Sequence, residues 1–224
     1  MYPLSGVKRW LLLAVVLVVS LISVMTVMTV SPRTQFVMGG ALVNAGFRLQ
    51  DPLHAYDFEK PELTAQEVWD EFQEQNRLSS MVREQFPRST EHPVVALLVC
   101  MDARIDTAEL AGDTRRYYYV IRTAGSVLAE EEQEMLELAV RNGVKVLVLT
   151  RHSDCAAEQV AADPERRAQY PLLARAVDER AAHVAAFLKR PLIAERLASG
   201  ALLVEQLFID TRSDQLLAEE PSPH

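Results

Sequence analysis

The two cysteines of this chain are spaced around one histidine in a pattern that could hold a metal ion. Cys100 follows the apolar run 94–99, and Cys155 lies three residues after His152, which itself follows the apolar run 144–149. Thiolates and a neutral imidazole are common zinc ligands, and three protein ligands leave a fourth position open for a reacting molecule. The pattern therefore favours a catalytic zinc site, and the alternative is a pair of buried thiols that bind no metal.

Alternating strands and helices would have to bring these residues together. Strand-like runs cover residues 94–99, 117–121, 144–149 and 201–209, and helical patterns cover 64–86, 130–141, 172–188 and 193–197. The alternation predicts an α/β fold with a mostly parallel sheet flanked by helices. Ligands in such sheets lie beyond the carboxyl ends of the strands, so Cys100 and His152 are expected to meet although they are 52 residues apart.

Three short motifs resemble the signatures of the β-class carbonic anhydrases. They are Cys-Met-Asp-Ala-Arg at 100–104, Arg-Thr-Ala-Gly at 122–125 and His-Ser-Asp-Cys at 152–155. Their order, spacing and flanking strands agree with that family, and the resemblance covers about residues 64–212.

The resemblance implies one zinc ion per chain, held by Cys100, His152 and Cys155. It also implies a catalytic pair, in which Asp102 orients a zinc-bound hydroxide and Arg104 holds Asp102 bidentately and ionised. The implied reaction is that of a carbonate dehydratase, a lyase: hydroxide attacks carbon dioxide and gives bicarbonate and a proton, reversibly.

The sequence departs from the family at two positions next to the zinc ligands. Arg151 and Ala156 stand where the family usually has glycine, so the shape of the pocket could differ while the ligands stay the same. Hydrolysis of carbonyl sulfide or carbon disulfide on the same fold is therefore an alternative. In the Arg-Thr-Ala-Gly motif, Arg122 could make a structural pair and Gly125 a tight turn, or both could contact substrate.

The N-terminal 60 residues read as a membrane attachment. Residues 10–30 are uncharged and would form a helix about 30 Å long, which matches the hydrocarbon core of a bilayer. We expect a cytoplasmic N-terminus (1–9), a transmembrane anchor (10–30), a glycine- and proline-interrupted tether (31–60) and an extracytoplasmic catalytic domain (61–224). A cleaved signal peptide and a buried core helix are the alternatives.

Charge and composition restrict the partners. The net charge is −8 and the acidic excess lies after residue 51, so the domain lacks the basic surface that binding to nucleic acid phosphates requires. The resemblance implies a homodimer or a larger oligomer, with the helix at 64–86 as an arm between subunits. A bicarbonate transporter is a possible membrane partner, and a non-catalytic, zinc-stapled transporter subunit is a further alternative, against which Asp102 and Arg104 argue.

Overall fold

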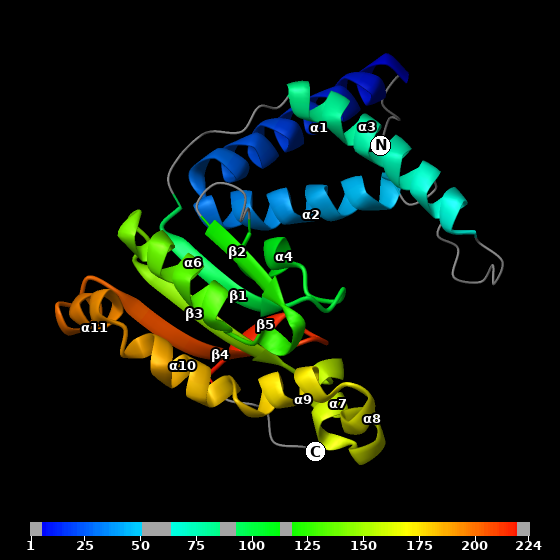
Figure 1. Cartoon of the computed structure of the whole chain (residues 1–224). Coiled ribbons are helices and arrows are strands. Elements are labelled where there is room, and N and C mark those ends of the chain that lie inside the picture. The colour runs from blue at the N-terminus through cyan, green and yellow to red at the C-terminus, as the bar shows by residue number, and fades with distance from the viewer. Residues whose placement is uncertain (1–5, 51–63, 86–92, 113–117, 219–224) are drawn as a thin grey trace. The chain divides into compact units, whose positions relative to one another are not determined.

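We analysed a computed structural model, which describes residues 6–50, 64–85, 93–112 and 118–218 (Figure 1). The chain divides into two compact units, residues 1–86 and residues 87–224, and each is described by itself. The second unit contains every residue to which the sequence assigns chemistry.

A five-stranded sheet forms the centre of the second unit, in the order β2-β1-β3-β4-β5 (Figure 1). The strands are β1 (Val95–Cys100), β2 (Tyr118–Thr123), β3 (Val146–His152), β4 (Leu203–Asp210) and β5 (Gln215–Leu217). All neighbouring pairs are parallel except β4 and β5, which are antiparallel. The mostly parallel sheet predicted from the sequence is confirmed, and the expected last strand is followed by a second, short one.

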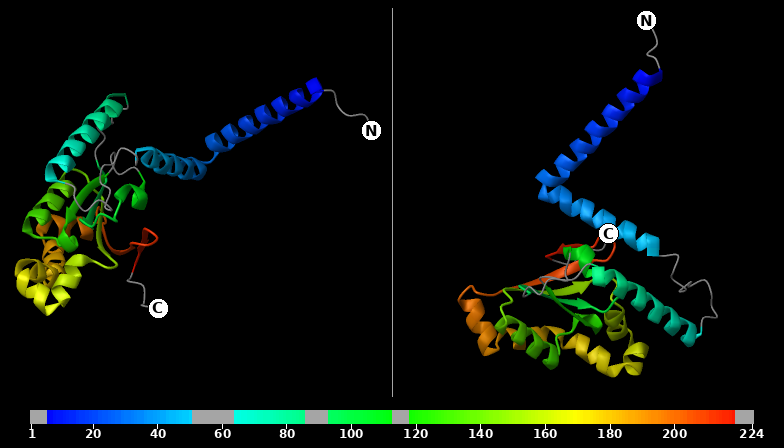
Figure 2. Two further views of the ribbon diagram at one scale, coloured as in Figure 1. Left: turned by 90° about the vertical axis from the view of Figure 1, so that its right-hand side faces the viewer. Right: turned by 90° about the horizontal axis from the view of Figure 1, so that it is seen from above.

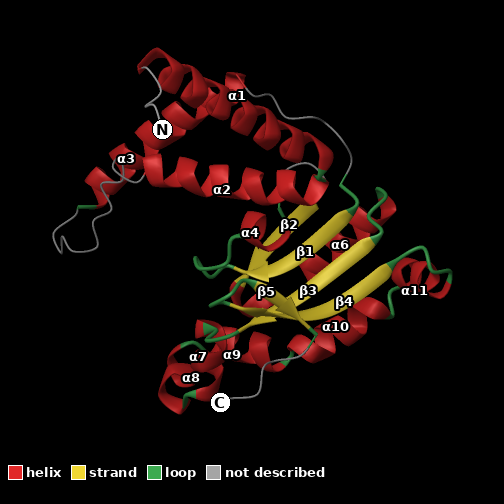
Figure 3. Ribbon diagram, turned by 180° about the vertical axis from the view of Figure 1, so that it is seen from behind, coloured by secondary structure: helices red, strands yellow, loops and turns green. Residues whose placement is uncertain are grey.

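Helices α6 (Glu130–Arg141), α10 (Arg180–Leu188) and α11 (Pro191–Ala198) cover one face of this sheet. They lie together on one side of the strands in the right-hand view of Figure 2, and behind the strands in Figure 3. Leu98 and Leu147 of the sheet are buried against Leu136, Phe187 and Ile193 of the helices. This apolar layer fixes the strands that carry the candidate metal ligands.

The pairing of β1 with β3 determines which residues of β3 point to which face. Leu98 lies opposite Leu149, and both belong to the core beneath the helices. Side chains alternate along a strand, so Arg151 extends on the same face as Leu149, whereas His152 extends on the opposite face with Val148. The register therefore places the imidazole and the neighbouring guanidinium on different sides of the sheet.

Several helical segments differ from the sequence prediction. The single helix expected at 172–188 is two helices, α9 (Pro171–Asp178) and α10, which meet at Glu179, whose N–H is shared between the carbonyls of Arg175 and Val177. Three short helices were not predicted: α4 (Thr107–Ala111), α7 (Ala156–Ala162) and α8 (Pro164–Gln169). The helices expected at 130–141 and 193–197 are confirmed as α6 and α11.

The first unit consists of α1 (Gly6–Val30), α2 (Pro32–Gln50) and α3 (Ala65–Gln85) over its described residues. The predicted irregular tether is wrong for residues 32–50, which form α2; residues 51–60 lie outside the described part. Proline is tolerated at a first helical position, and the Ser31 hydroxyl accepts a hydrogen bond from the Thr34 N–H at 3.4 Å, so the helix can begin there. The three glycines of α2 weaken the helix without forbidding it.

Two further predictions concern this unit. In the part of the chain that the structure describes, no helix is long and apolar enough to cross a membrane, so the anchor expected at 10–30 is not supported. The capping box that opens the helix at 64–86 is confirmed, since the Thr64 N–H donates to the Glu67 carboxylate at 2.8 Å and the Glu67 N–H donates to the Thr64 hydroxyl at 3.2 Å.

Candidate metal centre

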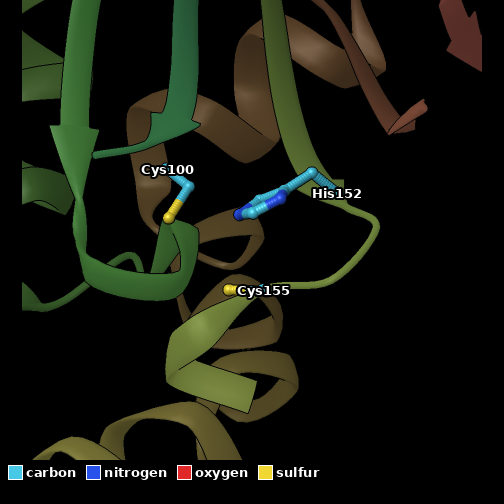
Figure 4. Close-up of side chains that lie close together, drawn as sticks. All are labelled: Cys100, His152 and Cys155. Atoms are coloured by element: carbon cyan, nitrogen blue, oxygen red, sulfur yellow. The ribbon is translucent and has the colours of Figure 1, made fainter. Parts of the chain in front are cut away.

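Cys100, His152 and Cys155 converge at the carboxyl ends of β1 and β3 (Figure 4). Cys100 is the last residue of β1, His152 is the last residue of β3, and Cys155 is the N-terminal capping residue of α7. All three are buried, and their ligand atoms lie within 4.8 Å of one another. The structure thus brings together the three residues that the sequence proposed as a metal site.

The histidine is oriented as a metal ligand would be. Its Nδ1 lies 2.8 Å from the carbonyl oxygen of Ser153, so Nδ1 carries the proton and donates it, and the lone pair is left on Nε2. Nε2 is buried and has no hydrogen-bond partner among the described residues, and the ring points towards the two sulfur atoms in Figure 4. A buried nitrogen of this kind requires a partner, which a metal ion would provide.

The surroundings of the two sulfur atoms shift the pKa values of Cys100 and Cys155 in opposite directions. The backbone N–H groups of Asp102 and Gly125 lower the pKa of Cys100, and those of Glu158 and Ala157 act in the same direction on the pKa of Cys155. The Cys155 thiol also donates to Cys100, which lowers the pKa of Cys100 and raises that of Cys155. Two thiolates and a neutral imidazole are a donor set that fits zinc, with three protein ligands.

Asp102 and Arg104 form a bidentate ion pair beside this cluster. Arg104 donates from Nε to one carboxylate oxygen at 3.0 Å and from a terminal nitrogen to the other at 2.8 Å. The guanidinium lowers the pKa of Asp102 to about 2, so the carboxylate is ionised at neutral pH. Arg104 also donates to the carbonyl oxygen of Asp154 at 3.2 Å, which ties the pair to the loop between His152 and Cys155. The structure therefore forms the acid–arginine pair that the sequence motif predicted.

A second carboxylate between two arginines was missed by the sequence analysis. Glu158 of α7 accepts hydrogen bonds from Arg180 at 2.6 Å and from Arg151 Nε at 3.3 Å. Burial alone would raise the pKa of Glu158, but the two arginines outweigh burial and lower it. The unusual Arg151 was visible in the sequence, whereas its partner lies on a helix that was not predicted. Arg151 extends away from the metal cluster and fastens the start of α7.

Arg122 and Gly125 have structural contacts. Arg122 donates to the carbonyl oxygen of Ile105 at 2.6 Å, and Gly125 adopts a positive φ of 64°. A Cβ atom at Gly125 would lie 3.0 Å from the Cβ of Ala157, so a side chain there is excluded by conformation and by space. These contacts support a structural role for Arg122 and for Gly125. A contact of either residue with substrate stays a prediction.

Comparison with known proteins places most of the second unit in one family. A family model described as carbonic anhydrase matches residues 95–218, which is more than half of the chain. Beta-carbonic anhydrase 1 of Mycobacterium tuberculosis (strain ATCC 25618 / H37Rv) is 32% identical over 75 residues, covering 33% of this chain and 46% of the relative. The protein of the same name from Mycobacterium bovis gives the same values. The alignment spans about half the length of these curated relatives.

Solved structures show the same fold. One is a tetrameric beta-carbonic anhydrase of the ascomycete Sordaria macrospora, with a TM-score of 0.50 and 18% identity over 65% of this chain and 92% of that one. Another is a carbonic anhydrase of Streptococcus mutans, with a TM-score of 0.50 and 17% identity over 65% of this chain and 95% of that one. At these identities the likeness concerns the fold.

Proposed function

We propose that this chain, which belongs to the carbonic anhydrase family, catalyses the reversible hydration of carbon dioxide to bicarbonate and a proton. The observation that carries the proposal is the buried convergence of Cys100, His152 and Cys155 beside an ionised acid–arginine pair. These three residues would hold one zinc ion per chain. Zinc bound by protein ligands supplies a water molecule whose pKa is lowered to about 7.

The acid–arginine pair would prepare that water for reaction. Asp102 is an acceptor throughout the neutral range, so it can take a hydrogen bond from the water and direct a lone pair towards carbon dioxide. Arg104 occupies both oxygens of Asp102, which keeps the carboxylate ionised and prevents it from turning towards the metal ligands.

The decisive experiment measures metal content and turnover on the same preparation of the full chain. One zinc per chain with carbon dioxide hydration in stopped flow supports the proposal, and one zinc without hydration contradicts it. A parallel assay with carbonyl sulfide tests the alternative substrate, because a carbonyl sulfide hydrolase would convert that compound faster than carbon dioxide.

The oligomeric state is a further part of the proposal. Helix α3 exposes Trp69 and Phe72, whose rings stack with centroids 5.7 Å apart, together with Met81 and Val82. Such a surface supports packing on another subunit in a homodimer or a larger assembly. Light scattering on the full chain tests this, since Trp69→Ser should lower the molar mass of the particle if α3 lies in a subunit interface.

Location at a membrane is another part of the proposal. Helix α1 exposes a series of large apolar side chains, among them Leu12, Leu17 and Ile22, which supports contact with lipid. The further proposal is that the catalytic domain lies on the extracytoplasmic side, beside a bicarbonate transporter. Fractionation tests this: the full chain should require detergent for release from membranes, and a chain without residues 1–50 should not.

A further inference from the structure

A cavity of about 490 Å³ lies under the helices of the second unit, on the face of the sheet to which Arg151 extends. The carboxyl-terminal parts of β3 and β4 form one wall, and the residues around the junction of α9 and α10 form another. None of the three candidate metal ligands lines it. The cavity is therefore separate from the metal centre, although Ser126 at its edge is adjacent to Gly125, whose backbone N–H lowers the pKa of Cys100.

Two residues that line this cavity carry buried hydrogen-bond donors that nothing in the described part of the chain accepts. Arg180 uses one terminal nitrogen for Glu158, while its Nε and its other terminal nitrogen are buried and unpartnered. Ser126 is only 3% exposed, and its hydroxyl is also unpartnered. Buried donors of this kind cost free energy unless an acceptor is supplied, so the pair points to a ligand with oxygen atoms.

The charges around the cavity favour an anion. Arg151 and Arg180 line it, and among the lining residues that the structure describes the only acidic one is Asp178, whose two oxygens both accept hydrogen bonds from Arg167. Glu158 lies nearby and already takes bonds from both lining arginines. The two unused nitrogens of Arg180 are the donor geometry that arginine presents to oxyanions, which it binds through parallel N–H···O bonds.

We propose that this cavity binds a small oxyanion on the free Nε and terminal nitrogen of Arg180 and on the hydroxyl of Ser126. Bicarbonate, inorganic phosphate and sulfate share the chemistry that these donors recognise. The site does not depend on the proposed hydration reaction, because it uses no metal ligand and neither member of the acid–arginine pair.

Titration calorimetry on the zinc-loaded full chain tests the proposal, with bicarbonate, phosphate and sulfate as separate probes at constant ionic strength set by sodium chloride. Arg180→Gln should weaken binding of the best probe by at least about tenfold, and Ser126→Ala by about threefold. Arg175→Gln is the matched control, because Arg175 lies on α9 with its side chain 71% exposed, and its binding should equal that of the wild type. The relative affinities of the three probes show which oxyanion the site prefers.

Two results would overturn the proposal. One is the absence of binding of all three probes to the wild-type protein up to about 50 mM, which is weaker than specific recognition requires. The other is equal binding by the wild type and both site variants, which would place any bound anion at the metal centre or on the surface. Circular dichroism and zinc content are measured on each variant. If Arg180→Gln does not fold, Ser126→Ala decides alone, since it leaves the bond between Arg180 and Glu158 untouched.

Discussion

Two arginine–carboxylate pairs stand next to the metal cluster, and they differ in exposure and in how completely the arginine is used. In the first pair, the side chain of Arg104 is 48% exposed and binds both oxygens of Asp102. In the second, the side chain of Arg180 is 12% exposed and binds Glu158 through one nitrogen only. The first pair thus presents an ionised carboxylate to the metal centre. In the second pair, Arg180 keeps buried donors that Glu158 does not use.

The two pairs nevertheless hold the same short segment. Arg104 donates to the carbonyl oxygen of Asp154, and Glu158 lies in the first turn of α7, the helix that begins directly after Cys155. The difference teaches that the same kind of arginine–carboxylate ion pair can serve the reaction or the positioning of a metal ligand. Which of the two it serves depends on the hydrogen-bonding groups that the pair leaves unused. The following predictions separate the two functions.

Replacement of Cys155, the metal ligand that this segment carries, should have the largest effect on zinc content and turnover. Cys155→Ala leaves two protein donors, so the zinc content should fall from one per chain to less than about a tenth, and turnover with it by more than about a hundredfold. Elemental analysis and stopped flow measure both quantities, with circular dichroism as the check of folding. If the variant kept one zinc per chain, Cys155 would not be a metal ligand. The two ion pairs would then not hold this segment in order to position a ligand.

Asp102→Asn tests the first pair alone. The amide cannot act as a charged acceptor, so carbon dioxide hydration should fall by about a hundredfold while zinc stays bound. Asp106→Asn is the control, because Asp106 is an N-terminal capping residue of α4 and asparagine caps equally well. Unchanged turnover in Asp102→Asn, or loss of zinc from it, would mean that the first pair has no separate role in reactivity.

Glu158→Gln tests the second pair, and here zinc affinity should change while turnover at full zinc occupancy should not. Loss of the charge loosens the start of α7, so zinc affinity should weaken by about tenfold, while turnover at saturating zinc changes by less than about twofold. Competition with a chromophoric chelator measures the affinity. Glu165→Gln, in the first turn of α8, is the control. An effect on turnover at full zinc occupancy would contradict the separation of the two pairs.

The smallest expected effect is on stability in acid. Because Arg104 lowers the pKa of Asp102 from its ordinary 3.8 to about 2, their interaction stabilises the folded state above about pH 4 and is lost as the pH falls from 4 to 2. Arg104→Gln should therefore lower the free energy of unfolding of the metal-free protein by about 1 kcal/mol at pH 5, after allowance for solvent screening of the half-exposed arginine. Urea unfolding should show this difference vanishing near pH 2; a difference independent of pH would exclude the ion pair as its cause.

The sequence predicted the metal cluster because its supports leave a strong local pattern. Residues 94–99 and 144–149 are apolar runs of strand length, and parallel strands bring their carboxyl ends to one edge of a sheet. Cys100 and His152 could therefore be placed together without knowledge of any contact. The pairing of Asp102 with Arg104 came from the resemblance of residues 100–104 to the motif of the β-class carbonic anhydrases.

The second pair could not be predicted, because Glu158 lies on a helix with a weak pattern and Arg180 follows a division between two helices that the pattern does not show. Residues 156–162 are mostly small or polar and show no apolar stripe, so α7 and with it Glu158 went unnoticed. The periodicity of 172–188 predicts one continuous helix, whereas the interruption at Glu179 lets Arg180 begin a new one beside Glu158. Residues 32–50 show the reverse error, since their glycines suggested an irregular segment where α2 forms.

Because of the register between β1 and β3, only molecules with correctly paired strands can form the metal centre. A shift of one residue along β3 would exchange the faces of His152 and Arg151 and present a guanidinium, which cannot bind a metal ion, to the two sulfur atoms. Molecules that pair these strands one residue out of step would therefore be unable to load zinc, however compact they become. The zinc content of a preparation would then count the molecules whose central strands have paired correctly, and metal loading would serve as an assay of folding.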